Sequence, residues 1–309
     1  MDTEKYIDLQ VNGYAGVDFN HDALSEDAVH FACERLREDG VAGILATVIT
    51  DELPRMEARL ARIAEICRRD SLADKVICGI HVEGPFLNET PGYVGAHPVS
   101  AVRPADLDSL RRLLDAADGR VRMVTLAPER DQGNKAIRYL ADHNILVSAG
   151  HCDPSLDELR AAIDAGLSIF THLGNGCPML LPRHDNVIQR VLSQCDRLTI
   201  CFIGDGVHIP AATLGNYLQL VGIEQAIIVT DAISAARLGP GRYTLGPQSV
   251  VIGDDRVARS TDDSHLVGST ATMPQMAAIL REKLGLSEDA VRRLLFENPR
   301  RVLRNVMKF

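Results

Sequence analysis

Metal-binding residue types follow short apolar runs at three places in the chain. The three runs are IHVEGPFLN (80–88), VSAGHCD (147–153) and IFTHLGN (169–175). They supply Glu83, His151 and His172, each followed by a glycine or a turn. Two histidines and one glutamate suit zinc and similar divalent ions, and a catalytic site leaves one coordination position open for water. The spacing therefore indicates a metal centre, although a single histidine or glutamate at a strand end is often only hydrogen-bonded or capping a turn.

A fourth run, IIVTDAIS (227–234), ends in a carboxylate, Asp231. A carboxylate beside a metal-bound water can take its proton and later return it to a leaving group. The strands of a parallel barrel end on one common rim. We therefore predict that Asp231 converges with the three metal-ligand residues on one site; the alternative is a helix N-cap.

Three further residues lie in loops that would reach the same rim. His97 belongs to NETPGYVGAHP (88–98), and loops of this length without structure of their own tend to be functional. His208 lies in IGDGVHIP, and Arg183 lies in LLPRHDN. For these two, a loop histidine facing solvent and a solvated surface arginine are the alternatives.

The elements that must position these residues alternate along the chain. Eight apolar runs rich in Val and Ile read as buried strands: 6–11, 42–49, 75–82, 121–127, 145–150, 168–173, 198–204 and 225–231. Amphipathic segments between them read as helices. This alternation predicts a single α/β domain over 1–309, a (β/α)8 TIM-type barrel. A doubly wound open sheet is the main alternative, but Gly13–Gly16 matches its glycine-rich first turn only weakly.

After the eighth run the sequence predicts an inserted hairpin at about 242–260, from RYTLG, SVVIG and VARS. Two or three closing helices are expected from about Ser269 to Val306. The remaining histidines are expected on the surface or on helices: His21, His30, His143, His184 and His265. Cys152, next to His151, is expected to be a small buried residue.

Composition limits the partners. The net charge of −9 argues against binding a nucleic-acid backbone, and the absence of Trp argues against a stacking platform. The seven cysteines show no CxxC pair, as in reduced cytosolic proteins, so a cytoplasmic location is expected. Neither a signal peptide nor a membrane-spanning apolar run is evident, so no membrane partner is expected.

Eight runs taken together resemble the N-acetylglucosamine-6-phosphate deacetylases of the amidohydrolase superfamily. They occur in the family's order and cover nearly the whole chain. The runs are DLQVNGYAGVDFN (8–20), HVEGPFLN (81–88), GAHP (95–98), SAGH (148–151), THLGN (171–175), DGVH (205–208), VTDA (229–232) and LVGSTATM (266–273).

The resemblance implies deacetylation of an amino sugar phosphate, with N-acetylglucosamine 6-phosphate as the expected substrate. It assigns the metal to the three residues named above and the acid/base role to Asp231, and it implies that His97 helps to polarise the acetyl carbonyl. The sugar-phosphate pocket would include His208, Asn175 and Gly176, with Gln10 also on the substrate side. Arg183 stands where the family has an arginine that reaches the phosphate of a neighbouring subunit, which implies a homodimer.

Departures from the family pattern refine these expectations. Many amidohydrolases carry HxH after strand one and hold two metals, whereas this chain has Gln10-Val11-Asn12; one divalent ion per chain, zinc, is therefore expected. Substitutions in THLGNGC and PRHDN fall in the sugar-phosphate pocket. The family's accessory β-sandwich is expected to be lacking. Two other functions stay open: hydrolysis of another N-acyl amino sugar or N-acyl amino acid, and a catalytically silent sugar-phosphate binding protein.

Overall fold

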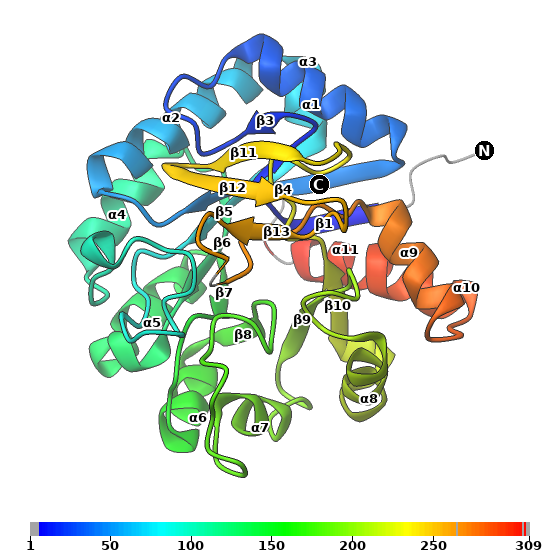
Figure 1. Cartoon of the computed structure of the whole chain (residues 1–309). Coiled ribbons are helices and arrows are strands. Elements are labelled where there is room, and N and C mark those ends of the chain that lie inside the picture. The colour runs from blue at the N-terminus through cyan, green and yellow to red at the C-terminus, as the bar shows by residue number, and fades with distance from the viewer. Residues whose placement is uncertain (1–5, 264, 305, 307–309) are drawn as a thin grey trace.

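The computed structural model describes residues 6–263, 265–304 and 306 (Figure 1). Within them, eight parallel strands form one sheet whose order follows the chain. These strands are β1 (Tyr6–Val11), β4 (Val41–Ile49), β5 (Ile77–Glu83), β6 (Val121–Leu126), β7 (Leu146–Ala149), β8 (Leu167–Phe170), β9 (Thr199–Ile203) and β10 (Ala226–Val229). Helices surround the sheet in Figure 1, so the predicted (β/α)8 barrel is confirmed. The doubly wound alternative is wrong, because the strand order has no reversal.

A few contacts between the β1 region and the segment just after β10 close the barrel. Val11 and Ala232 form an isolated parallel bridge, and the Asn12 amide donates to the Ala232 carbonyl at 2.7 Å. Asp8 accepts hydrogen bonds from the backbone and the hydroxyl of Thr230. This closure brings the end of β1 beside the segment that carries Asp231.

The helices outside the barrel largely follow the predicted segments. They are α1 (Glu26–Glu38), α2 (Leu53–Arg69), α4 (Leu107–Ala116), α5 (Lys135–Asp142), α6 (Leu156–Ala165), α7 (Val187–Leu192) and α8 (Ala211–Val221), with short 3-10 turns η1 (Val99–Ala101), η2 (Pro128–Arg130), η3 (Gln132–Asn134) and η4 (Ile223–Gln225). Serine side chains cap α1 and α6: Ser25 accepts from the Ala28 amide, and Ser155 forms a capping box with Glu158.

Two features were missed from the sequence. Helix α3 (Ser71–Val76) was not predicted, and its last two residues lie in the run assigned to the third strand. Its N-cap Asp70 accepts from the amides of Leu72 and Ala73. A small hairpin of β2 (Gly13–Tyr14) and β3 (Val17–Asp18) follows β1. Both are too short for hydrophobic periodicity to reveal.

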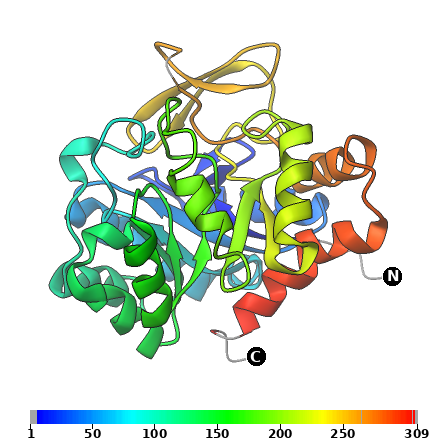
Figure 2. The same cartoon turned by 90° about the horizontal axis from the view of Figure 1, so that it is seen from below.

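The inserted hairpin is a three-stranded antiparallel sheet of β11 (Gly241–Leu245), β12 (Gln248–Ile252) and β13 (Ala258–Ser260). It stands over one end of the barrel (Figure 2). A separate apolar cluster attaches it to the rim, and Ile49 at the end of β4 is part of this cluster. Its other buried members are Ile233, Ala235, Leu245, Val250, Ile252, Ala258 and Val267.

The closing helices also agree with expectation. They are α9 (Met273–Glu282), α10 (Glu288–Arg292), the π-helical turn η5 (Arg293–Glu297) and α11 (Asn298–Arg304). The buried amide of Asn298 donates to the carbonyls of Ile223 and Ala226, which fixes the closing helices at the start of β10.

The expectation that the barrel lacks an accessory sandwich rests partly on the two chain ends. Residues 1–5 and 307–309 lie outside the described residues. Within the described part of the chain, no helix has both the length and the apolar character that a membrane span requires.

The attachment of the three-stranded sheet can be tested at Ile252. Its side chain is buried in the cluster with Ile49, whereas the neighbouring Val251 is only half-buried on the opposite face. Ile252→Ala should lower the free energy of opening the sheet by roughly 2–5 kcal/mol, because it leaves a cavity. Hydrogen exchange of the β11–β13 amides measures this.

Val251→Ala is the matched control, with an expected loss below about 1 kcal/mol. Equal effects of the two substitutions would mean that the sheet is not held through this cluster.

Candidate active site and metal centre

The carboxyl ends of the barrel strands and the three-stranded sheet enclose a cavity of 720 Å³. Its lining brings together most of the residues that the sequence singled out: Glu83, His97, His151, His172, Asn175, Gly176, His208 and Asp231. Two predicted site residues are not part of this lining. Gln10 lies behind it, and Arg183 is exposed on the loop between β8 and α7.

Glu83, the last residue of β5, is the centre of a cluster of buried donors. Its Oε1 lies 3.0 Å from His172 Nε2 and 3.5 Å from His151 Nε2. The Gln10 amide nitrogen donates to the same oxygen at 3.1 Å. On the other side of His151, His97 Nε2 lies 3.3 Å from His151 Nε2. Candidate ligand atoms of Glu83, His97 and His151 all lie within 4.8 Å of one another.

The orientation of His151 suits a metal ligand. Its Nδ1 donates to the Tyr93 carbonyl at 2.8 Å, which fixes the ring with Nε2 directed at Glu83 and His97. The ring is enclosed by two glycines in left-handed conformations. A Cβ on Gly176 would lie 2.6 Å from His151 Nδ1, and one on Gly95 would lie 2.8 Å from its Cε1. Larger residues at either position would displace the ring.

Three site residues adopt backbone conformations that L-residues rarely occupy. The φ angles are 51° for His151, 33° for His172 and 51° for Asp231. The three residues follow β7, β8 and β10 respectively, each two residues after the end of its strand. Such conformations cost about 1–3 kcal/mol each and persist where the surrounding structure imposes them, commonly at functional sites. Here they turn each side chain from the strand direction into the cavity.

A buried polar layer lies below these residues, inside the barrel. His81, two residues before Glu83 on the same strand face, contacts the hydroxyls of Thr125 at 2.7 Å and Thr47 at 3.4 Å. The chain of contacts continues through Thr171 to Ser148. Burial lowers the pKa of His81 to about 4, so its ring is neutral. This layer satisfies polar groups that would otherwise be buried without partners.

The electrostatics of the cluster fit a cation. Burial by itself would raise the pKa of Glu83, but the hydrogen bonds and charge of its histidine neighbours hold it well below its ordinary value. Burial and the nearby His151 lower the pKa of His97 to about 3, so His97 is a neutral ring. Burial opposes protonation of His172, but its hydrogen bond and charge interaction with Glu83 raise its pKa. A carboxylate with imidazole rings is the donor set that zinc and related ions accept, and the rings bind the ion in their neutral form.

Unpartnered atoms around the cluster point the same way. Among the described residues, four of the buried side-chain atoms without a hydrogen-bond partner lie at this site: Gln10 Oε1, Asn12 Oδ1, His97 Nδ1 and His172 Nδ1. Buried polar groups are normally satisfied, so their concentration here indicates that a ligand, ion or water completes the site. The residues therefore fit a divalent cation.

Asp231 is a second carboxylate of the site, and its pKa is raised. Asn12 Nδ2 donates to its Oδ1 at 2.7 Å. Burial and the negative charge of Glu83 raise the pKa of Asp231 to about 6. The group is thus ionised at neutral pH but close to accepting a proton, which suits a general base that later acts as an acid. The barrel closure between Asp8 and Thr230 positions the segment that carries it.

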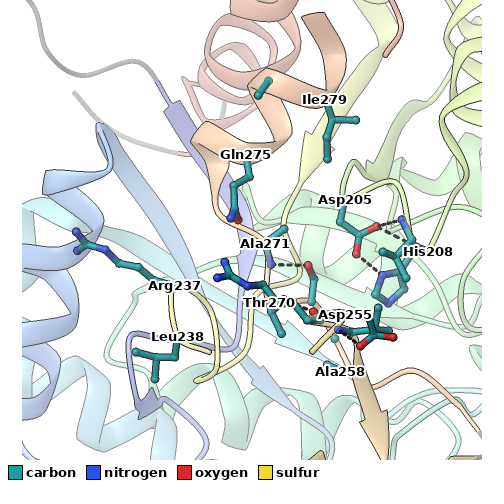
Figure 3. Close-up of a pocket in the computed structure, with 16 residues that line it drawn as sticks. Asp205, His208, Arg237, Leu238, Asp255, Ala258, Thr270, Ala271, Gln275 and Ile279 are labelled. Atoms are coloured by element: carbon teal, nitrogen blue, oxygen red, sulfur yellow. Dashed lines mark hydrogen bonds and ion pairs between the residues drawn. The ribbon is translucent and has the colours of Figure 1, made fainter. Parts of the chain in front are cut away.

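His208 lies at the boundary between this cavity and a second one of 360 Å³. Its Nδ1 donates to Asp205 Oδ2 at 2.7 Å, and Asp205 also accepts from the His208 amide (Figure 3). Burial opposes ionisation of Asp205, but the hydrogen bond and charge of His208 lower its pKa. Asp205 therefore fixes the ring and leaves Nε2 available.

Sequence reasoning missed several residues that line the cavity. Asn12 was considered only as a poor zinc ligand, yet it binds Asp231. Arg259, Asp263 and His265 reach the cavity from the three-stranded sheet and the loop that follows it. His265 was expected on the surface; it is exposed, and it also lines the cavity. No motif marks these residues, because an inserted sheet can pack over the barrel in many ways.

Comparison with known proteins gives consistent results. No protein-family model matches the chain. It is 33% identical over 294 residues to an N-acetylglucosamine-6-phosphate deacetylase of Bacillus subtilis, covering 94% of this chain and 72% of that protein. It is also 33% identical over 301 residues to an N-acetylgalactosamine-6-phosphate deacetylase of Escherichia coli O157:H7, covering 96% and 77%.

Solved structures agree in fold. A mutant of the N-acetyl-D-glucosamine-6-phosphate deacetylase of Mycobacterium smegmatis, in complex with N-acetyl-D-glucosamine-6-phosphate, superposes with a TM-score of 0.88 at 32% identity, over 97% of this chain and 77% of that one. The Pasteurella multocida N-acetylglucosamine-6-phosphate deacetylase gives 0.87 at 25% identity, over 99% and 78%.

Cation binding at the cluster can be tested at Glu83. Glu83→Gln keeps the side-chain volume but removes the only carboxylate of the three grouped donors, Glu83, His97 and His151, found in the described part of the chain. We expect the affinity for a divalent ion to fall by roughly 100-fold or more, beyond the loss typical of outer hydrogen-bond partners. Metal content after dialysis against a metal buffer measures it.

Glu129→Gln is the matched control. Glu129 is another largely buried carboxylate, bonded to Asn88 and to the Asp153 amide, and it does not line the cavity. Retention of the metal by Glu83→Gln, or its equal loss in both variants, would exclude Glu83 as a ligand.

Proposed function

The chain belongs to the family of N-acetylglucosamine-6-phosphate deacetylases, and we propose that it is a metal-dependent hydrolase that converts N-acetylglucosamine 6-phosphate to glucosamine 6-phosphate and acetate. The observation that carries this proposal is the convergence of Glu83, His97, His151, His172 and Asp231 on one barrel rim. The activities named for its relatives support the same substrate class.

We assign the metal site to Glu83, His151 and His172, with one zinc ion per chain. The contacts of Glu83 with both histidines support this set, and the closeness of His97 to His151 places a further nitrogen beside it. A bound divalent ion polarises a carbonyl and makes water more acidic. Gln10 has an orienting role, because it donates to the Glu83 carboxylate.

Asp231 moves the proton. Its carboxylate takes a proton from the attacking water as the C–O bond forms at the acetyl carbon. It then gives this proton to the sugar nitrogen as the C–N bond breaks, which releases acetate and the amine. The raised pKa, about 6, supports both steps, and the Asn12 amide fixes the carboxylate while its charge changes.

The remaining cavity residues orient the substrate. His97 is a neutral ring and can donate a hydrogen bond to the acetyl oxygen through whichever nitrogen carries its proton. His208, held by Asp205, contacts the sugar, and Asn175 and Gly176 contact the sugar phosphate through their backbone.

A second substrate is favoured by one observation. The relative from Escherichia coli O157:H7, an N-acetylgalactosamine-6-phosphate deacetylase, is as similar in sequence as the one from Bacillus subtilis. The galactose epimer is therefore the alternative within the same chemistry. The alternative of a catalytically silent binding protein is disfavoured. The chain keeps all of the candidate metal ligands and the acid/base carboxylate, and binding a sugar phosphate does not require all of these residues.

We further propose a homodimer in which Arg183 reaches the neighbouring subunit's site. In its own subunit Arg183 is exposed and absent from the cavity lining. The same loop exposes Met179 by 98% and Leu180 by 93%, and such large apolar side chains suit burial against a second copy. A cytoplasmic location is part of the proposal; the free cysteines support it.

Acetate release tests the proposed reaction. Protein of known metal content should release acetate from N-acetylglucosamine 6-phosphate far faster than from unphosphorylated N-acetylglucosamine, at one metal per chain. N-acetylgalactosamine 6-phosphate is assayed beside it to decide between the epimers. Absence of acetate from all three, with metal bound, would contradict the proposal.

Asp231→Asn is the diagnostic variant for this reaction. It should fold and hold the metal but lose roughly 10²–10⁴-fold in kcat, the usual contribution of a positioned acid/base. Near-normal turnover in this variant would exclude Asp231 as the proton carrier.

Subunit complementation tests Arg183. Arg183→Ala should raise KM for the phosphorylated substrate by roughly 10-fold or more, because a charge-assisted hydrogen bond is lost. A mixture reassembled from Arg183→Ala and Asp231→Asn subunits should regain about a quarter of the wild-type sites, since half of the dimers pair one intact site with an intact arginine. Failure to regain low-KM activity would place Arg183 outside the partner's site.

A further inference from the structure

Arg259 is the only arginine or lysine, among the described residues, that lines the catalytic cavity of its own subunit. We propose that Arg259 binds the phosphate of the substrate and is the residue by which the three-stranded sheet selects phosphorylated amino sugars. This inference deepens the proposed function and rests on it for the identity of the ligand. Neither a motif nor the family pattern quoted above assigns a role to this position.

The side chains that line the cavity carry more negative than positive charge. Its lining includes three carboxylates, those of Glu83, Asp231 and Asp263, against one arginine. A phosphate dianion entering this cavity is repelled by these carboxylates unless a nearby cation compensates. The guanidinium forms two parallel hydrogen bonds with a phosphate, which histidine rings cannot do.

The location of Arg259 matches the shape of an amino sugar phosphate. The candidate metal ligands are buried at the barrel end, whereas β13 lies in the sheet that stands over that end (Figure 2). Arg259 is also bridged to Leu266, another residue of the cavity lining. A sugar whose acetamido group reaches the buried cluster would extend its phosphate toward the sheet.

The guanidinium is held in place from outside the cavity. Asp255 accepts from Nη2 at 2.7 Å and from Nη1 at 3.1 Å. Asp255 lines the neighbouring cavity (Figure 3) and not the catalytic one, so this pair lies in the wall between the two. It fixes the arginine before substrate arrives, which reduces the entropy lost on binding.

Asp263 forms an ion pair with Arg259 on the side of the catalytic cavity. Its Oδ1 lies 3.2 Å from Arg259 Nε, its side chain is 78% exposed, and it lines the catalytic cavity. An exposed ion pair of this kind contributes little to stability and is easily broken. The substrate phosphate replaces Asp263, whereas the Asp255 pair stays. Arg259 thus acts in the same subunit, in contrast to the proposed role of Arg183.

Calorimetry with glucosamine 6-phosphate and glucosamine separates the phosphate contact from other effects. Arg259→Met should weaken binding of glucosamine 6-phosphate by roughly 10- to 100-fold, because a charged hydrogen-bond donor is lost, and leave glucosamine binding unchanged. Arg259→Lys should recover part of the loss. Arg242→Met is the matched control: Arg242 is exposed on β11 of the same sheet and does not line the cavity.

Asp263→Asn should change the affinity for glucosamine 6-phosphate in the opposite direction from Arg259→Met. It removes the competing carboxylate, so binding of glucosamine 6-phosphate should tighten relative to wild type. In steady-state assays Arg259→Met should raise KM for the phosphorylated substrate and leave kcat nearly unchanged. A structural role for Arg259 would instead lower kcat and weaken glucosamine and glucosamine 6-phosphate alike.

The calorimetric binding measurements test the phosphate site independently of the proposed reaction. A wild type that binds glucosamine 6-phosphate in an Arg259-dependent way but releases no acetate would refute the reaction and support the phosphate site. Equal binding of glucosamine 6-phosphate by wild type and Arg259→Met would overturn the inference, as would a wild type with no preference for glucosamine 6-phosphate over glucosamine.

Discussion

The buried carboxylate of Glu83 is the constraint on which the rest of this structure depends. An ionised carboxylate removed from water is costly unless several donors or a cation compensate it. In this chain the compensation comes from three elements distant in sequence: Gln10 on β1, His151 after β7 and His172 after β8. Closing the barrel is what brings these donors to one oxygen, so the fold and the candidate metal centre form together. The same arrangement leaves nearby histidine and amide atoms without partners among the described residues, which favours a bound cation.

The local backbone conformation directs the site residues toward the buried carboxylate of Glu83. Strands β7, β8 and β10 stop early, and the residues that follow them adopt left-handed conformations that the barrel must stabilise. Gly95 and Gly176 approach the His151 ring so closely that no side chain fits at either position. On the far side, Asn12 and the closure through Ala232 place Asp231 near the charge of Glu83, and that proximity, together with burial, raises its pKa. The acidity required of a proton carrier is thus a consequence of how β1 meets β10.

Sequence reasoning reached the barrel and the central cluster because both depend on local patterns. Unbroken apolar runs identified the eight strands, and His or Asp directly after a run identified the rim residues. What it could not reach depends on packing. The contact between His97 and His151 is made by a long loop whose path no periodicity encodes. The pairing of Asn12 with Asp231 joins the two ends of the barrel. Helix α3 was not predicted because its six residues are too few to show a helical period, and its last two residues were assigned to the third strand.

The barrel and the inserted sheet contribute different residues to the site. The barrel supplies the buried residues that a hydrolytic reaction on an amide needs, and these are fixed by closure and by the polar layer around His81. The sheet is attached through a separate apolar cluster and through hydrogen bonds such as that from the Gly246 amide to Asp18, so its residues outside these contacts can change without disturbing the barrel core. In the proposed site, Arg259 and its two carboxylate neighbours add to the selection of phosphorylated sugars from outside the reacting centre, beside the contacts proposed for Arg183, Asn175 and Gly176. A site built in this way can keep its chemistry while its substrate changes, which is how one fold accommodates related activities.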